Sequence, residues 1–277
     1  MQENIQVTVI KPSHGYSLNN FRQLWEYREL LYFFVWRDIK VRYKQTVIGI
    51  AWAVVQPLFA MLIFTLFFSR LAEVPSDGIP YPIFSYAALV PWLFFANGLS
   101  KCSDSLINSV NLVKKVYFPR LIIPVSAVLS GMVDFGFTLL VLFFMMPFFG
   151  LIPGWSIIWL PLIIILAIIT CLGVGLWLSA MNALFRDIRY VVPFLIQLWL
   201  FASPVVYPSS LLGEPWRSLY GINPMAGVIE GFRWVLLGSK VNIPGFILFI
   251  STMISVLTLV TGLIFFGRFE KKIADVL

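Results

Sequence analysis

Residues 121–185 read LIIPVSAVLSGMVDFGFTLLVLFFMMPFFGLIPGWSIIWLPLIIILAIITCLGVGLWLSAMNALF. These 65 residues contain one charged side chain, Asp134, and they are interrupted by the turn-forming run GLIPGW at Gly150–Trp155. A helix needs about 20 apolar residues to cross a bilayer, and the stretch on each side of the turn is long enough. We therefore predict a helical hairpin of two membrane spans.

Four further uncharged stretches flank this hairpin, and each can cross a bilayer. They are Gln45–Ser69, Gly78–Ser100, Tyr190–Gly213 and Val241–Gly267, with 25, 23, 24 and 27 residues. Of the 277 residues, 60% are hydrophobic and 12% are charged, which excludes a soluble domain and a nucleic-acid-binding protein. The sequence predicts an all-α polytopic membrane protein with six transmembrane helices over residues 45–268.

The basic residues indicate how these spans are oriented. With the N-terminus inside the cell, 16 of the 20 Lys and Arg residues fall in cytoplasmic segments, and the other four are Arg70, Arg217, Arg233 and Lys240. This bias follows the positive-inside rule. The first twenty residues also lack the basic start and apolar core of a signal peptide, so we expect both termini to be cytoplasmic.

Two segments outside the spans carry apolar residues of their own. Residues 1–44 are a predicted cytoplasmic segment, in which Leu18–Trp36 is expected to form an amphipathic helix that lies on the inner membrane interface, packs on a partner, or does both. The external residues 208–240 are too apolar for a solvated loop, so we predict short helices that re-enter the outer leaflet before the last span. Residues 269–277 form a predicted cytoplasmic tail.

The residues that usually carry catalysis are scarce. Cys102 and Cys171 are the only cysteines and His14 is the only histidine, which disfavours a disulfide framework, haem and metal sites. The sequence contains no Gly-Lys pair, so it has no P-loop for ATP. We expect no catalytic residue, no metal and no cofactor in this chain, which is therefore not predicted to be an enzyme.

Asp134 is the one charged residue within the predicted spans. It leaves no carboxylate pair for glycosyl chemistry and no relay for protons. A lone carboxylate in lipid is costly unless it is paired or neutral. Asp134 could gate or couple transport, but a hydrogen bond to Asn97 or to a Ser or Thr of a neighbouring helix is the favoured interpretation.

Two predicted helix faces combine a glutamine with aromatic rings. They follow helical spacing and consist of Trp52, Gln56, Phe59 and Ile63 in the first span, and of Tyr190, Phe194, Gln197 and Phe201 in the fifth. Sugars present C–H faces to rings and hydroxyls to amides, so these faces suit a sugar pathway. Plain helix packing explains them equally well.

Four motifs resemble one family along nearly the whole chain. They are RDIKVRYKQTVIGIAWAVVQP at Arg37–Pro57, KKVYFPRLIIP at Lys114–Pro124, ALFRDIRYVVP at Ala183–Pro193 and NPMAGVIEGFRWVLLG at Asn223–Gly238. The chain resembles the permeases of polysaccharide-exporting ABC transporters, the O-antigen (Wzm-type) and teichoic-acid group. The resemblance implies a homodimer in the bacterial inner membrane, two separate ATP-binding cassette subunits that hold ATP and Mg, and a lipid-linked polysaccharide as cargo of lipopolysaccharide biosynthesis.

The resemblance also assigns parts of the chain to roles. The segment Ser103–Tyr117 corresponds to a coupling helix that the ATPase receives, with Ser103 and Asp104 able to cap it and basic residues near its end, and Phe185–Tyr190 corresponds to a second contact. The expected coupling residues are Ser103, Asp104, Leu106, Asn108, Lys114, Arg186 and Asp187.

The family's re-entrant region corresponds to Asn223–Gly238 and implies a lid at the outer mouth, in which Glu230 and Arg233 are expected to stabilise their helix. The basic cluster Arg37, Lys40, Arg42 and Lys44 meets the inner headgroup plane. There it could hold the pyrophosphate of the lipid carrier, or attract anionic membrane lipids in general.

Two alternatives stay open at this point. The cargo could be teichoic acid, capsule or a small drug-like molecule instead of an O-antigen-like glycan. The chain could also be a membrane scaffold for glycan assembly that needs no nucleotide-binding partner.

Overall fold

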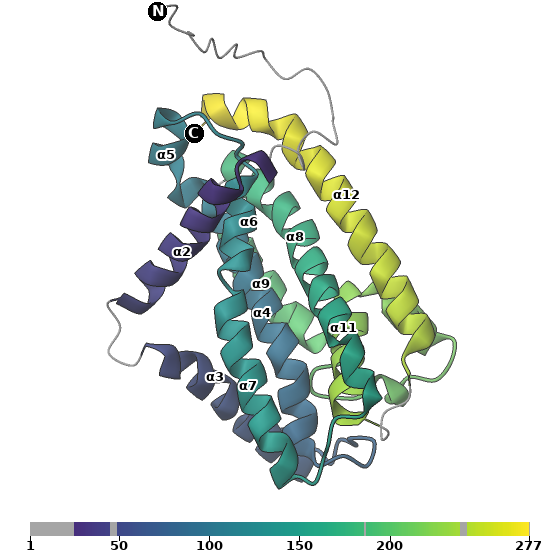
Figure 1. Ribbon diagram of the computed structural model, residues 1–277. Helices are drawn as coiled ribbons and strands as arrows, with labels where there is room; N and C mark the ends of the chain where they lie inside the picture. Colours follow the sequence, from purple (N-terminus) through teal and green to yellow (C-terminus); the bar gives the residue numbers. More distant parts are fainter. Residues whose placement is uncertain (1–24, 45–48, 186, 239–242, 277) are drawn as a thin grey trace, which may run out of the picture.

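The computed structural model describes residues 25–44, 49–185, 187–238 and 243–276, and within these ranges the chain consists of helices joined by turns (Figure 1). The helices bundle around α4, Tyr81–Asn108, which contacts helices from both halves of the chain. The all-helical architecture expected from the sequence is confirmed for the described residues.

The charge-free hairpin is present as predicted. Its first arm is α6, Ile122–Leu129, followed after a short break by α7, Met132–Phe148. A turn then leads through a short 3₁₀ helix, Trp155–Trp159, into α8, Leu160–Leu184. The combined arms span 27 and 30 residues, long enough to cross a bilayer.

The described part of the chain contains five helical segments that are long and apolar enough to cross a membrane. Besides the two hairpin arms they are Ala51–Leu71, which includes a π-helical end and all of α3 (Ile50–Phe64) but its first residue, then Tyr81–Asn108, and Gly245–Glu270 within α12 (Gly245–Val276).

The stretch predicted as the fifth span forms a shorter helix. Helix α9, Ile188–Phe201, has 14 residues, or about 21 Å at 1.5 Å per residue, against a hydrocarbon thickness of about 30 Å. At its end the carbonyl of Ala202 accepts a hydrogen bond from the side chain of Asn223 at 2.9 Å, and the chain then turns back. The helix expected over Tyr190–Gly213 is therefore wrong in its second half.

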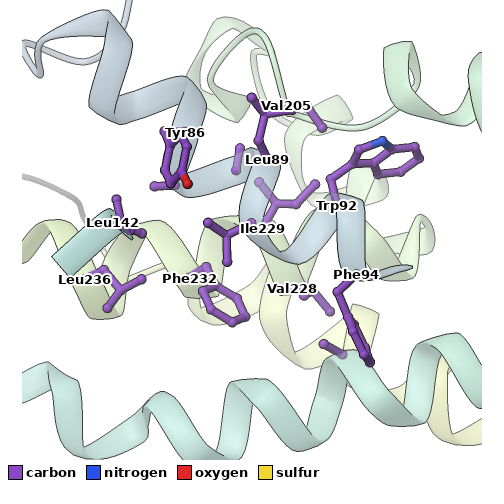
Figure 2. Packing of buried hydrophobic residues seen from close by; sticks show 14 of the residues in the cluster. Tyr86, Leu89, Trp92, Phe94, Leu142, Val205, Val228, Ile229, Phe232 and Leu236 are labelled. Atoms are coloured by element: carbon purple, nitrogen blue, oxygen red, sulfur yellow. The ribbon is translucent and has the colours of Figure 1, made fainter. Parts of the chain in front are cut away.

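The core lies where α4, α7 and α11 (Pro224–Leu237) meet, and it is built from apolar side chains at helical spacing (Figure 2). Figure 2 shows Phe232 and Leu236 of α11 beside Leu142 of α7. The rings of Phe135 and Phe232 pack edge to face with their centres 5.8 Å apart. Helix α11 is almost completely buried, so it is an integral helix of the bundle.

Helices α8 and α12 form the most intimate pair in the bundle. A Cβ atom on Gly173 would lie 2.8 Å from the backbone nitrogen of Leu259, and one on Gly262 would lie 2.7 Å from the carbonyl oxygen of Gly173. Small residues let membrane helices approach until their backbones touch. The two glycines therefore set the distance between these helices.

Helix α2, Arg28–Lys44, replaces the predicted amphipathic helix and extends past its expected end at Trp36. Its Phe34 is buried against Phe118, with ring centres 5.6 Å apart, and α2 packs along α6. Tyr32 and Phe33 are exposed on other sides of the same helix. Apolar residues therefore surround α2 instead of forming one stripe, while the expected start at Leu18 lies outside the described residues.

Candidate functional site

A cavity of about 560 Å³ lies between α2, α3, α4 and α7. Charged and polar side chains from all four helices reach it, accompanied by aromatic rings. Its lining includes Arg42, Tyr43, Trp52, Gln56, Phe94, Asn97, Lys101, Asp134, Phe135 and Thr138. The cavity therefore combines a charged end with rings and amides.

Asp134 is the centre of the charged end. Its carboxylate accepts hydrogen bonds from the Arg42 guanidinium and from the Tyr43 hydroxyl, and the Lys101 ammonium lies 3.9 Å from its Oδ2. The guanidinium also donates to Ser130 Oγ at 3.2 Å. The expectation of an Asn97, Ser or Thr partner is corrected, because α2 brings an arginine and a tyrosine to a residue 91–92 positions away in the chain.

Tyr43 acts in this cavity as a neutral hydroxyl. Partial burial, followed by its hydrogen bond to Asp134, raises the pKa of Tyr43 to about 12. The hydroxyl therefore keeps its proton at any physiological pH and remains a donor. With Arg42 it ties the end of α2 to α7.

The predicted basic cluster on α2 divides in the structure. Arg42 lines the cavity, whereas Arg37 pairs with Asp38 at 2.8 Å and lies over the Phe34 ring. Lys40 lies over the ring of Trp36, with its ammonium 4.4 Å from the ring centre. Lys44, the last residue of α2, is exposed. Of the four basic residues, Arg42 alone is among the residues that line the cavity in the described structure.

The two glutamine-and-aromatic faces are separate within one chain. Trp52 and Gln56 line the cavity, while Phe59 is exposed and is not part of the lining. The second face, Tyr190, Phe194, Gln197 and Phe201, is exposed along α9, which packs on α4 and α8 through its other side. Both faces are therefore open to whatever surrounds the single chain.

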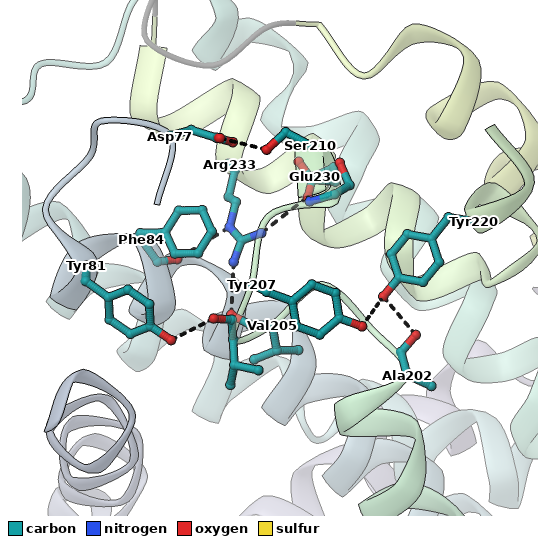
Figure 3. Close-up of polar contacts among 12 residues, drawn as sticks. Asp77, Tyr81, Phe84, Ala202, Val205, Tyr207, Ser210, Tyr220, Glu230 and Arg233 are labelled. Carbon is teal, nitrogen blue, oxygen red and sulfur yellow. Dashed lines mark hydrogen bonds and ion pairs between the residues drawn. The ribbon is translucent and has the colours of Figure 1, made fainter. Parts of the chain in front are cut away.

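A buried ion pair fixes the chain that follows α9 (Figure 3). Arg233 is 1% exposed, and its guanidinium donates to Glu230 at 3.3 Å and to the carbonyl of Val205 at 2.9 Å. It also lies 3.6 Å from the centre of the Phe84 ring, while Glu230 accepts from the backbone N–H of Ser209 at 3.2 Å. The pair thus holds the turn after α9 between α4 and α11, which is a structural role.

The start of α11 is fixed by Asn223 and by a serine of α12. The Asn223 side chain accepts hydrogen bonds from the backbone N–H of Met225 and from the indole N–H of Trp199. It therefore caps α11 and joins the start of α11 to α9. Ser251 lies against Gly227, where a Cβ atom would come within 2.4 Å of the serine Cβ. The NPMAG part of the fourth motif therefore caps α11 and lets it pack closely against α12.

The predicted coupling helix is two pieces. Ser103 and Asp104 lie inside α4, which continues to Asn108, so neither residue caps a helix and that expectation is wrong. Leu106 is buried in the bundle and Asn108 is exposed. The short helix α5, Val110–Lys115, follows, and its last turn carries Lys114 and Lys115 near the end, as predicted.

The two predicted coupling segments touch each other. Asp104 accepts a hydrogen bond from the Asn182 side chain at 3.0 Å and lies 3.7 Å from the Arg189 guanidinium. Asn182 is in α8 and Arg189 in the first turn of α9, so the end of α4 is joined to the α8–α9 connection. Asp187, exposed just before α9, shares this face, while Arg186 lies outside the described residues.

Sequence reasoning missed several residues of the cavity. Lys101 and Tyr43 were not singled out, although Lys101 lies one turn after Asn97 and Tyr43 stands between Arg42 and Lys44. Their signal is three-dimensional, because α2 and α4 meet Asp134 only in the folded chain. Cys102 and Cys171 are free and buried, as packing residues should be. Within the described ranges no three His, Cys, Asp or Glu side chains come close enough to hold a metal.

Comparison with known proteins adds a second line of observation. The ABC-2 type transporter family matches residues 29–237. The chain is 31% identical to the O-antigen export system permease protein RfbA of Myxococcus xanthus over 215 residues, which cover 76% of this chain and 82% of the relative.

Two further relatives span most of the chain. A protein of the same name from Klebsiella pneumoniae is 31% identical over 242 residues, or 87% of this chain and 92% of the relative. The polysialic acid transport protein KpsM of Escherichia coli is 22% identical over 85% of this chain and 91% of the relative.

Proposed function

The chain belongs to the ABC-2 type transporter family of membrane permeases, and from this premise we propose that it exports a lipid-linked, O-antigen-like polysaccharide across the bacterial inner membrane. It is homologous to O-antigen export permeases and is a transport component. Two copies would form the permease, and two separate ATP-binding cassette subunits, which carry ATP and Mg, would drive it.

The observation that carries this proposal is the mixed lining of the cavity. Arg42 and Lys101 supply positive charge at one end, and Trp52 and Gln56 supply a ring and an amide beside it. A glycan attached to a phosphorylated lipid needs both kinds of group, since phosphate binds cations and sugars bind rings and amides. Arg42 and Lys101 would face the phosphate end, and the basic residues of α2 outside the cavity would attract the anionic headgroups of the surrounding bilayer.

The glycan would then pass between the two copies. The exposed faces of α3 and α9 each present glutamine and aromatic side chains, which suit a passage that binds each sugar weakly and repeatedly. In a dimer these faces would line the pathway. The buried helix α11 and the short elements before it would close the pathway at the outer side.

A six-span topology with both ends in the cytoplasm agrees with the arrangement in Figure 1. The beginning of α2, the end of α12 and helix α5 all lie at the top of that view. When both ends lie on the same side, the number of crossings must be even. The five long segments give an even number only if α9 and the turn after it form a sixth crossing. The basic residues support the cytoplasm as that side.

The energy would enter at the same end. The exposed residues of α5 and of the α8–α9 connection would meet the ATPase, and the Asp104–Arg189 contact would let both segments respond together. ATP hydrolysis would thus act on α4 and α9, the helices that continue from these segments.

The test replaces Trp52 and Phe201 with alanine, one residue from each face. We expect export of the surface glycan to fall strongly, while the chain still assembles with its ATPase. The matched control replaces Trp155 and Phe144, two exposed aromatic residues away from both faces, and should export normally. Normal export by the Trp52→Ala/Phe201→Ala chain would reject the assignment of the pathway.

Deleting the gene identifies the cargo. Accumulation of a lipid-linked O-antigen-like polymer on the inner leaflet supports the proposal, and accumulation of a capsule or teichoic-acid polymer redirects it to those cargoes. A chain that copurifies with a glycan synthase and without an ATPase would instead be a scaffold.

A further inference from the structure

The cavity contains an acid between two bases, and this arrangement suggests how it is used. Asp134 contacts both Arg42 and Lys101, and Tyr43 donates a neutral hydroxyl to the same carboxylate. The nearby Asp38 is engaged by Arg37 at 2.8 Å. The lining contains two cations and one carboxylate, which gives it one net positive charge. The residues that form the cavity therefore do not neutralise it.

The two cations are held unequally. Arg42 is tied by Asp134 and by Ser130, and its side chain is 22% exposed. Lys101 is 40% exposed, and its ammonium is 3.9 Å from Asp134 Oδ2, which is too far for a hydrogen bond. Within the described part of the chain the Lys101 ammonium makes this ion pair and no hydrogen bond, so its N–H donors are available to a ligand.

The surroundings of Lys101 define what kind of ligand fits. Asn97 lies one helical turn before it on α4, and Trp52 and Gln56 of α3 line the same space. A bare ion would leave these groups without a partner. A headgroup that joins an anion to a sugar would engage the ammonium, the amides and the ring together.

The charge of the ligand follows from what it must replace. Asp134 already supplies a single negative charge to both cations, so an incoming carboxylate would gain little by exchange. A pyrophosphate that joins a lipid to a sugar carries a charge of about −2 and offers several unesterified oxygens, so it attracts the two cations more strongly than a single carboxylate does.

We propose that Asp134 is an internal counter-ion that the pyrophosphate of a lipid-linked sugar displaces, and that Lys101 is the cation that receives this group. The inference rests on the proposed function, because it concerns the lipid-linked end of the exported glycan. It assigns specificity to Lys101 and a competing role to Asp134. Displacement of Asp134 also releases the tie between α2 and α7 that Arg42 and Tyr43 make.

The experiment measures equilibrium binding of radiolabelled farnesyl pyrophosphate to the nucleotide-free transporter complex in phosphatidylcholine nanodiscs. Lys101→Gln should weaken binding about tenfold, and Lys101→Arg should restore it, because a charge-assisted contact is lost and regained. Asp134→Asn should tighten binding by about threefold to tenfold, because it removes the competing charge and keeps an acceptor for Tyr43. The matched control is Lys40→Gln, which removes the same charge from α2 outside the cavity and should change binding less than about twofold.

Opposite results would overturn the proposal. Equal losses for Lys40→Gln and Lys101→Gln would mean general attraction between charges, and weaker binding by a thermally stable Asp134→Asn chain would make Asp134 part of the ligand site. Displacement of the probe by inorganic pyrophosphate supports recognition of the phosphate group itself, whereas equal displacement by phosphatidylglycerol overturns it. If gene deletion leaves glycan export intact, the proposed function fails while Lys101-dependent binding still stands.

Discussion

Replacing Arg233 with methionine should destabilise the chain by about 3–5 kcal/mol, the usual cost of breaking a buried ion pair by removing one partner. Arg233 is 1% exposed, and its loss leaves the Glu230 carboxylate without its cation. It also leaves the carbonyl oxygen of Val205 without this donor and removes a 3.4 Å contact with the carbonyl of Phe84. The methionine fills much of the volume, so the charge and the hydrogen bonds account for most of the loss.

The measurement is the free energy of unfolding in mixed micelles with increasing sodium dodecyl sulfate, followed by circular dichroism. Glu230→Met/Arg233→Met should recover most of the stability and remain about 1–2 kcal/mol below the wild type, because the Ser209 N–H still lacks its acceptor. The control is Arg37→Met, which breaks a partly exposed pair and should cost less than about 1 kcal/mol. A loss under 1 kcal/mol for Arg233→Met, or a double variant as unstable as the single one, would refute the reasoning.

Three further predictions follow from the packing and the charges. Gly227→Ala should lower the melting temperature and the yield of folded chain, because the new Cβ would overlap α12. The control Gly136→Ala, where nothing lies within 4 Å of the new Cβ, should be neutral or stabilising. Equal behaviour of the two variants would contradict this prediction. Asp104→Asn and Arg189→Gln should each change stability by less than about 1 kcal/mol, since their pair is partly exposed, yet lower the ATP hydrolysis of the assembled complex several-fold. The pKa of Tyr43 is raised to about 12, so its proton stabilises the folded chain below pH 10 and this contribution disappears as pH rises to about 12. The melting temperatures of wild type and Tyr43→Phe should therefore converge over that interval, and divergence would count against the hydrogen bond.

The helices were predictable where charge and length alone decide them. The hairpin of residues 121–185 follows from its near absence of charge and its Gly/Pro turn, and the structure confirms both arms. The end of α9 was not predictable in this way, because Ala202 is capped by Asn223, a residue 21 positions later. Hydropathy counts apolar residues and carries no information about such a contact.

The candidate site was only partly predictable for the same reason. Trp52 and Gln56 were found from their spacing on one helix, and Arg42 from its place in a basic cluster. Lys101 joins them only because α4 passes beside α7, and the partner of Asp134 comes from a helix about 90 residues away. The capping role predicted for Ser103 and Asp104 was wrong, because good capping residues inside a long helix look the same in sequence as caps.

The contact between Gly173 and Gly262 decides which part of the transporter can act as its frame. Backbones that touch cannot slide along each other by a helical turn, because every neighbouring side chain would collide with the opposite main chain. We therefore expect helices α8 and α12 to move as one rigid body during transport. We expect the larger movements in α3 and α9, which expose most of their apolar side chains and pack lightly against the rest of the bundle.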